Sequence, residues 1–337
     1  MIGRRPHLVS LRIAVRRPTR ARVPGKLSGM NRPGLRDLAG ALALLASAGA
    51  CVHSPCSAAP LAVEVLGSGG PIPDDDRASS AYVICVDGRS RVLIDAGGGS
   101  FVRFAEAGAH FEALDFVGLT HLHVDHSTDL PALLEAGFFS ARTRPLIVAG
   151  PDHGGSFPGI GEWLTLLLGP AGAYRYLDWE LDEHRGPWHV DVRELDHRSR
   201  EAVEIDLDNE GLRIAAIGVT HGPVPALAYR VEIDGHAIVF SGDQNGDDPE
   251  FVAFARGAEL LVMNHAIGEH PDEVAEQLHA KPSEIAEIAR AAGVETLVLS
   301  HHMARSLVEL ERSRQTILRR FDGRLEVAED HGCYTLD

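Results

Sequence analysis

The stretch 120–126, Thr-His-Leu-His-Val-Asp-His, constrains the fold of this chain more than any other part of its sequence. It places three imidazoles and one carboxylate within six positions, directly after an apolar-rich segment. Neutral imidazole and carboxylate are ordinary ligands of zinc and related divalent ions. Because neighbouring side chains diverge, one metal ion rarely uses all four groups of so short a segment. The arrangement therefore predicts two metal ions side by side. One would take His121 and His123, the other Asp125 and His126.

The run resembles the His-x-His-x-Asp-His signature of the metallo-β-lactamase superfamily. That resemblance implies an α/β (α+β) fold, a four-layer αβ/βα sandwich with a metal site along one edge, and further ligands downstream. Three later residues match in family order, each where a strand-like segment ends: His221, Asp243 and His301. Strand ends suit ligands because the sheet fixes the backbone while the side chain projects into a cleft. The matched positions imply one metal held by His121, His123 and His221, another held by Asp125, His126 and His301, and Asp243 bridging both.

The last ligand position has two candidates, His301 and His302. The family's last ligand follows a Ser or Thr directly after the strand. Ser300-His301 fits that pattern, so we favour His301 and keep His302 as the alternative.

The chain resembles the ribonuclease Z-like branch of the superfamily in three segments: Gly67-Ser-Gly-Gly, Arg77-Ala-Ser-Ser and Leu93-Ile-Asp-Ala-Gly. In that branch the first glycine loop and the Asp-x-Gly turn border the active site. The alternative is that these glycines only form tight turns. They are not a dinucleotide fingerprint, because Gly97-Gly-Gly lacks the Gly-x-Gly-x-x-Gly order.

His279 precedes a predicted helix, as does a histidine of the ribonuclease Z pattern that points at the scissile group. The match is partial, since Lys281-Pro282-Ser283 stands where the family has a Thr. An imidazole that titrates near neutrality suits a proton donor. We assign catalytic roles to His279 and Asp125, with a surface or capping role as the alternative for His279. We expect His265 to make a structural hydrogen bond.

The resemblance, which covers about residues 61–336, implies a dinuclear metal-dependent hydrolase. The ligand types favour two Zn²⁺ ions, with Mn²⁺ or Fe²⁺ as alternatives. The favoured activity is attack of a metal-bridged hydroxide on a phosphodiester or sulfate ester of a small molecule. The alternatives are a ribonuclease Z-type endonuclease acting on transfer RNA 3′ ends, a lactonase or β-lactamase-type carbonyl hydrolase, and a non-catalytic metal-stabilised binding protein. The metal site does not discriminate among these substrates.

The N-terminus has the sequence pattern of a leader peptide. Residues 1–36 contain ten Lys or Arg and no acidic residue, and an apolar run over 38–50 ends in small residues. This pattern is typical of a secretory signal peptide and is too short for a comfortable membrane span. We therefore expect residues 1–56 to be an N-terminal extension with Met30 as the natural start, residues 57–337 to be the hydrolase domain, and the protein to be periplasmic or secreted. Cys51 partly resembles a lipid attachment site.

The charge balance argues against nucleic acid as a partner. The chain has 32 basic and 48 acidic residues, and removal of residues 1–56 leaves 22 and 47, a net charge of −25. Such a field repels polyanions at long range. In the ribonuclease Z family a long flexible arm captures transfer RNA, and residues 170–200 show no Gly/Pro-rich basic segment of that kind. We expect a small-molecule ester as substrate; a homodimer is compatible with the sequence.

Local patterns predict the connections. Asp87-Gly88, Asp234-Gly235 and the segment 209–211 are typical of hairpin turns. We expect a helix over 283–292 capped by Ser283, and one helix over 306–321. Residues 170–200 predict either a lid or a surface excursion with a small local core. Two isolated cysteines in strands, Cys85 and Cys333, are typical of buried thiols, with their pairing left open.

Overall fold

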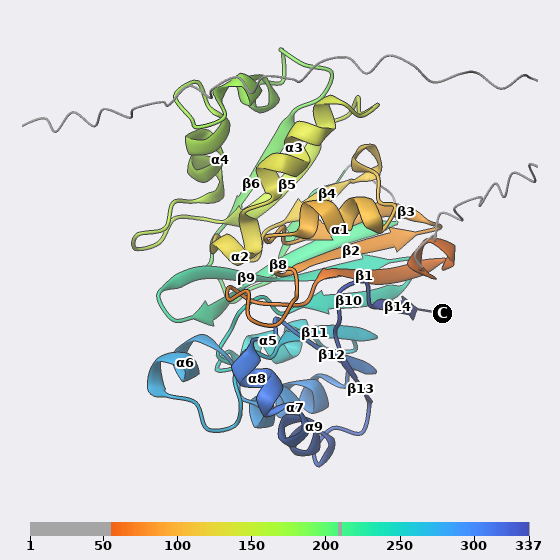
Figure 1. The fold of residues 1–337 in the computed structure, drawn as a ribbon, viewed down its shortest axis with the longest axis vertical. Helices are drawn as coiled ribbons and strands as arrows, with labels where there is room; N and C mark the ends of the chain where they lie inside the picture. Colours follow the sequence, from red (N-terminus) through yellow and green to blue (C-terminus); the bar gives the residue numbers. More distant parts are fainter. Residues whose placement is uncertain (1–54, 208–210, 337) are drawn as a thin grey trace, which may run out of the picture. The chain divides into compact units, whose positions relative to one another are not determined.

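Two seven-stranded sheets form the centre of the computed structural model, which describes residues 55–207 and 211–336 (Figure 1). The predicted leader, Met30, Cys51 and residues 209 and 210 of one predicted turn lie outside the described residues. The first sheet has the order β14 (Cys333–Leu336), β1 (Leu61–Gly67), β2 (Ala81–Val86), β3 (Arg89–Ile94), β4 (Phe116–Gly118), β5 (Leu146–Pro151) and β6 (Val190–Leu195). The second has the order β13 (Arg324–Val327), β12 (Thr296–Ser300), β11 (Leu260–Asn264), β10 (His236–Phe240), β9 (Val224–Ile233), β8 (Leu212–His221) and β7 (Val203–Ile205).

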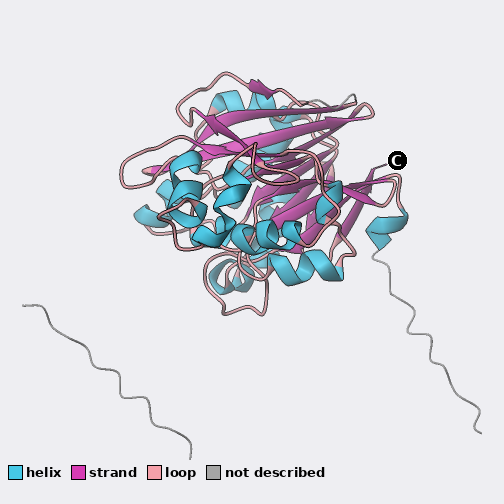
Figure 2. Ribbon diagram, turned by 90° about the horizontal axis from the view of Figure 1, so that it is seen from above, coloured by secondary structure: helices cyan, strands magenta, loops and turns pink. Residues whose placement is uncertain are grey.

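Helices cover the outer face of each sheet, so that the sheets lie in the middle of four layers (Figure 1; Figure 2 distinguishes helices from strands by colour). On the first sheet lie α1 (Ser100–Glu106), α3 (Leu130–Phe138) and α4 (Ile160–Leu168), with the 3₁₀ helices η2 (Phe111–Ala113) and η3 (Arg175–Leu181). On the second lie α5 (Pro249–Phe254), α7 (Pro282–Ala292) and α9 (Leu310–Leu318). Three short helices complete the list of α-helices in the described residues: α2 (Val124–Ser127), α6 (Glu273–Leu278) and α8 (Ala304–Val308). This is the predicted αβ/βα sandwich.

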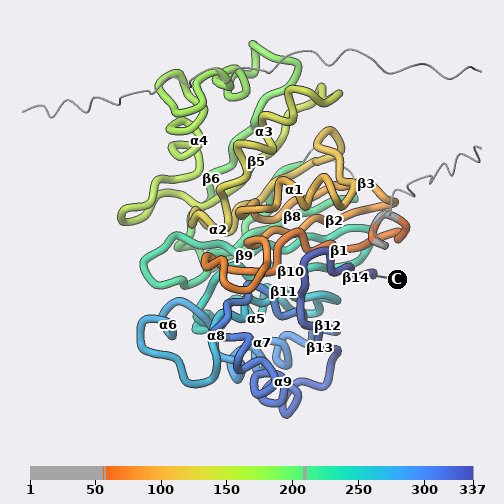
Figure 3. The backbone as a smooth tube through the Cα atoms, in the orientation of Figure 1, coloured from red at the N-terminus to blue at the C-terminus, as the bar shows by residue number. Residues whose placement is uncertain are grey.

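Three apolar cores hold the layers together. Between the sheets, Val63 and Ile84 of the first pack against Tyr229 and Phe240 of the second. The other two cores lie between each sheet and its helices. Burial of such side chains stabilises the fold by roughly 1.5–3 kcal/mol each relative to exposure. The last strand, β14, pairs with β1 and forms one edge of the first sheet (Figure 3).

Two predicted hairpins are confirmed. The turn residues Asp87 and Gly88 have φ of 48° and 73°, and Asp234 and Gly235 have 52° and 93°. Two successive positive φ values define the type I′ turn, whose twist matches that of the flanking strands. β2 pairs with β3, and β9 with β10, in antiparallel register.

Two helix predictions are wrong in detail. The expected helix 306–321 is divided into α8 and α9, because Glu309 leaves helical geometry at φ −100° and ψ 6°. The cap of α7 is not Ser283. The helix begins at Pro282 after Lys281, whose backbone N–H donates to the Glu284 carboxylate at 2.8 Å. Pro suits this first position because its missing N–H would have no partner there.

Residues 170–200 form η3 and the edge strand β6 rather than an unpatterned lid. Leu177 and Trp188 are buried in the core between the first sheet and its helices. The surface excursion with a local core is therefore the better description of this segment.

Of the two cysteines predicted to be buried thiols, Cys85 is one and Cys333 is not. Cys333 of β14 forms a disulfide with Cys56 of η1 (Pro55–Ala58), and Cys85 is a free buried thiol. β1 separates Cys85 from Cys333, because its Ala62 is paired with Cys85 and its Glu64 with Cys333. Two strand spacings are about 9–10 Å, too far for a disulfide. The folded unit thus includes residue 56, which the sequence placed in the extension. None of the described helices is long and apolar enough to cross a membrane.

Candidate metal centre

The seven predicted ligands meet at one edge of the sandwich, although four separate segments of the chain supply them. The segment after β4 carries His121 and His123, and α2 carries Asp125 and His126. The remaining three lie at or just after strand ends: His221 on β8, Asp243 after β10 and His301 after β12. α2 and the β8–β9 turn lie on the same side of the fold (Figure 1). The structure brings the residues together; their role as ligands remains a prediction.

Asp243 lies at the centre of the group. Its Oδ2 is 3.4 Å from His301 Nε2, 3.6 Å from His221 Nε2 and 3.9 Å from His121 Nε2. Its Oδ1 is 3.6 Å from His126 Nε2. One carboxylate therefore faces imidazoles from both expected sets, as a bridging ligand would.

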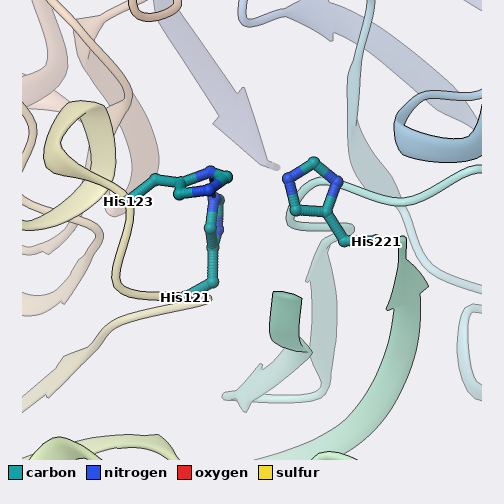
Figure 4. Close-up of side chains that lie close together, drawn as sticks. All are labelled: His121, His123 and His221. Atoms are coloured by element: carbon teal, nitrogen blue, oxygen red, sulfur yellow. Dashed lines mark hydrogen bonds between the residues drawn. The ribbon is translucent and has the colours of Figure 1, made fainter. Parts of the chain in front are cut away.

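The first expected set, His121, His123 and His221, has its donor atoms within 4.8 Å of one another. His121 Nε2 and His123 Nδ1 are 3.0 Å apart, and the ring of His221 faces them from the end of β8 (Figure 4). His221 Nδ1 donates to the carbonyl of Leu278 at 2.8 Å. This bond fixes the tautomer and leaves Nε2 directed at the centre, as in metal-binding histidines.

The second expected set, Asp125, His126 and His301, is equally close. Asp125 Oδ2 lies 3.2 Å from His301 Nε2 and 3.6 Å from His126 Nε2. His301 has φ of 54°, a left-handed conformation that is uncommon for a residue with a side chain. Such conformations cluster at functional sites, where the surrounding structure holds them in place.

Asp95 braces the second set, a role that the sequence did not reveal. His126 Nδ1 donates to Asp95 Oδ2 at 2.8 Å, and the backbone and hydroxyl of Thr120 donate to the same carboxylate at 2.7 and 2.9 Å. Burial raises the pKa of Asp95, although the positive charge of His126 acts to lower it. The only sequence signal was a carboxylate in the Asp-x-Gly turn at the end of β3.

The electrostatics of the group fit a bound cation. Burial alone would lower the pKa of His126, but Asp95, Asp243 and Asp125 outweigh it and raise that pKa to about 10. Burial opposes ionisation of Asp243, yet the surrounding imidazoles, led by His301, hold its pKa well below the usual range. His126 Nε2 and His221 Nε2 are buried and have no hydrogen-bond partner. Buried carboxylates beside unpartnered imidazole nitrogens are a donor set that suits divalent ions.

His279 also faces the centre from the end of α6. Its Nδ1 is 3.9 Å from Asp243 Oδ2, is buried and has no hydrogen-bond partner. Burial lowers its pKa to about 3, so the ring is neutral near pH 7. His279 is therefore not a surface histidine, and its catalytic role remains a prediction.

His301, not His302, points into the centre. His302 Nε2 donates to the carbonyl of Leu299 at 3.1 Å, and its Nδ1 is 3.4 Å from His265 Nδ1. The structural contact expected of His265 is present, with His302 as its partner.

The glycines of both loops border the centre. A Cβ at Gly70 would lie 2.8 Å from His301 Cε1, and one at Gly97 would lie 2.1 Å from the carbonyl oxygen of Asp125. The first loop is held in place by the backbone bond from Gly70 N to His302 O, 2.9 Å long. These glycines thus permit close approach to the predicted ligands and do more than form tight turns.

Comparisons with known proteins agree with this geometry. The family model described as a β-lactamase superfamily domain matches residues 90–302, a range that includes all seven predicted ligands. Ribonuclease Z of Mycobacterium marinum is 31% identical over 283 residues, covering 80% of this chain and 96% of that protein. Ribonuclease Z of Mycobacterium bovis is 30% identical over 285 residues, with the same coverage.

Two solved structures show the same fold. The metallo-β-lactamase fold protein YhfI from Bacillus subtilis superimposes with a TM-score of 0.62 at 21% identity, covering 82% of this chain and 99% of that one. Human tRNase Z, short form, superimposes with a TM-score of 0.59 at 23% identity and the same coverage.

Proposed function

Because the chain belongs to the metallo-β-lactamase superfamily, in its ribonuclease Z-like branch, we propose that this metal-dependent hydrolase cleaves phosphodiester bonds. The similarity to ribonuclease Z along 80% of the chain carries the proposal. It supports a ribonuclease Z-type endonuclease acting near RNA 3′ ends better than the small-molecule activity that the sequence favoured. The complete set of seven ligand-type residues supports an active site over a non-catalytic binding protein.

The fold implies divalent metal ions, and the residues present fit two of them. When bound, two such ions lower the pKa of a water between them and polarise the phosphoryl oxygen. We propose that His121, His123 and His221 hold one ion, that Asp125, His126 and His301 hold the other, and that Asp243 is shared. The preponderance of imidazole favours zinc.

The chain's own groups would then orient the ester. Asp125 lies 3.2 Å from His301 in the second set. Burial opposes ionisation of Asp125, but His126 and His301 lower its pKa to about 2, so the carboxylate stays negatively charged. His279 is neutral and unpartnered, so an Nδ1–H aimed at the centre can donate a hydrogen bond to the leaving oxygen as its charge develops. The buried surroundings strengthen that interaction by excluding water.

A small phosphodiester or sulfate ester is the second candidate substrate. The acidic balance of the chain, net −16, disfavours a polyanion. The sequence shows no basic arm in the segment 170–200. This segment instead forms η3 and β6, which pack in the core between the first sheet and its helices. The Cys56–Cys333 disulfide supports an oxidising compartment.

We also propose that the protein is exported. The basic and apolar leader pattern and the disulfide support this together. N-terminal sequencing and mass analysis of the protein recovered from cells would test it. Cleavage between residues 50 and 56 is expected. A lipid on Cys51 would show that the leader is processed as in a lipoprotein. A mature chain that keeps residues 1–50 would contradict export by this route.

A matched substrate panel tests the function. The metal-loaded protein would be assayed on a 3′-extended transfer RNA precursor, bis(p-nitrophenyl) phosphate, an aryl sulfate, a lactone and a chromogenic β-lactam, each beside Asp243→Ala. Precursor cleavage lost in the variant would support the endonuclease. Turnover of the small esters alone would favour the second candidate. Turnover of the lactone or β-lactam alone would contradict phosphodiester hydrolysis.

A further inference from the structure

We propose that Phe157 is a platform on which a planar aromatic group of the substrate, a nucleobase or an aryl ring, stacks beside the metal centre. The inference rests on the proposed hydrolase function and names the substrate feature that its site would select.

Access to the centre lies on the side of His123. Of the seven predicted ligands, all described, His123 is the one that is half-buried, and the other six are buried. Val124, the next residue along, is 73% exposed. A substrate would therefore approach the ions past these two residues.

Phe157 stands at this opening. Its ring centroid is 5.5 Å from that of His123, with an angle of 63° between the planes. Phe157 is a half-buried residue, as expected of one that receives a ligand at this opening. Because the edge of one ring meets the face of the other, Phe157 presents an aromatic surface next to the first set of predicted ligands.

The backbone, rather than deep burial of the ring, fixes Phe157. Gly154 and Phe157 exchange two backbone hydrogen bonds of 2.9 and 3.1 Å. Asp152, at the start of the loop, accepts from the backbone N–H of His197 at 3.0 Å and from its Nδ1 at 2.5 Å. Gly154 lies so close to Pro225 that an added Cβ would be 2.7 Å from Cγ. A loop backbone held in this way loses little freedom when a ligand binds.

Apolar side chains also lie close to other predicted ligands. Ile72, which is 48% exposed, follows the glycine loop that touches His301. A Cβ at Gly70 would lie 3.3 Å from Met303 Cε, and Leu278 borders Gly222 next to His221. Stacking of a base on an aromatic side chain strengthens binding roughly 10- to 100-fold.

The test compares product-like ligands with and without a ring. Calorimetry on the metal-loaded protein would measure AMP against ribose 5-phosphate, and phenyl phosphate against methyl phosphate. The wild type should bind the ring-bearing member of at least one pair roughly 10- to 100-fold more tightly. Tighter binding of AMP than of ribose 5-phosphate would indicate a site for a nucleobase. Tighter binding of phenyl phosphate than of methyl phosphate would indicate a site for an aryl group. Phe157→Ala should abolish the preference, and Phe157→Trp should keep it.

Two controls separate stacking from simple damage. Phe139→Ala removes a ring that is 80% exposed at the end of α3 and should change neither preference. Phe157→Leu keeps an apolar cover but no planar face, so it should bind metal normally and lose the preference. A preference that survives in Phe157→Ala, or that is absent from the wild type, would overturn the inference. Turnover of bis(p-nitrophenyl) phosphate, measured on the same samples, tests the proposed function separately.

Discussion

The two sets of predicted ligands share Asp243 but differ in how they are held. The second set, Asp125, His126 and His301, is wholly buried and is braced by the carboxylate of Asp95. The first set opens to solvent at His123 and is braced by a backbone carbonyl through His221. A charged brace raises the basicity of its histidine more than a neutral one. The comparison suggests a tightly held inner ion and an outer ion beside the substrate.

Loss of the shared carboxylate should have the largest effect, because both sets depend on it. Asp243→Ala should lower phosphodiester turnover by about 10³-fold or more, beyond the loss typical of one stabilising group. Elemental analysis should show fewer than two ions per chain. Asp74→Ala, an exposed carboxylate on the loop after Gly70, is the matched control. Full turnover in Asp243→Ala would show that the two sets work independently.

His279→Ala should separate chemistry from ion binding. The ring faces Asp243 but belongs to neither set, so turnover should fall about 10²- to 10³-fold while two ions remain bound. The comparison should use kcat on bis(p-nitrophenyl) phosphate and on an ester with a better leaving group, which needs less help from His279. His110→Ala, a histidine with a 71% exposed side chain, is the control. An ion lost from His279→Ala would instead make this residue a ligand.

Asp95→Ala should weaken the second set more than the first, because Asp95 bonds His126 directly and reaches His121 only through the Thr120 hydroxyl, 3.2 Å from His121 Nδ1. Without the bond to Asp95, His126 is no longer oriented, and affinity for one ion should fall about 10- to 100-fold. Competition with a chromogenic chelator would resolve the two affinities. Equal weakening of both ions would refute the distinction between the sets.

The pH dependence of metal affinity should also distinguish the two sets. The pKa of His126 is raised to about 10, so in the metal-free protein it carries a proton that an ion must displace. Affinity of the second set should rise about tenfold per pH unit from pH 7 toward pH 10. Burial lowers the pKa values of His121, His123 and His221, which are neutral at pH 7, so affinity of the first set should change little there. Metal titrations at pH 7, 8 and 9 would measure both.

The same linkage affects the stability of the metal-free protein. Since the folded pKa of His126 lies above its unfolded value, its stabilising contribution is complete below about pH 6.5 and disappears as the pH rises toward 10. The midpoint of urea unfolding should therefore decrease over that range. His126→Gln should flatten the decrease, and an unchanged slope would contradict the raised pKa.

The sequence predicted the donors better than the groups that hold them. The family resemblance singled out His221, Asp243 and His301, and the structure brings all three to the same centre at or just after strand ends. Asp95 acts through His126 because β3 and β4 are parallel neighbours, and no local pattern reveals that pairing. The Cys56–Cys333 disulfide likewise depends on β14 returning to β1.

Loop geometry was the least predictable feature. Phe157 comes near His123 through one short backbone bridge in a loop without periodicity. α6 and β6 were missed because the first is a short surface helix and the second has mixed burial. Asp-Gly turns were predictable because their positive φ values restrict the residue types that fit.

The central claim is that two ions sharing Asp243 form one catalytic site. The most direct test is to titrate the metal-free protein with zinc while following turnover of bis(p-nitrophenyl) phosphate and of the transfer RNA precursor. Turnover of at least one substrate should rise to its maximum at two equivalents and should be absent from Asp243→Ala at any amount of zinc. Maximal turnover at one equivalent, or no turnover of either substrate with two ions bound, would contradict the claim.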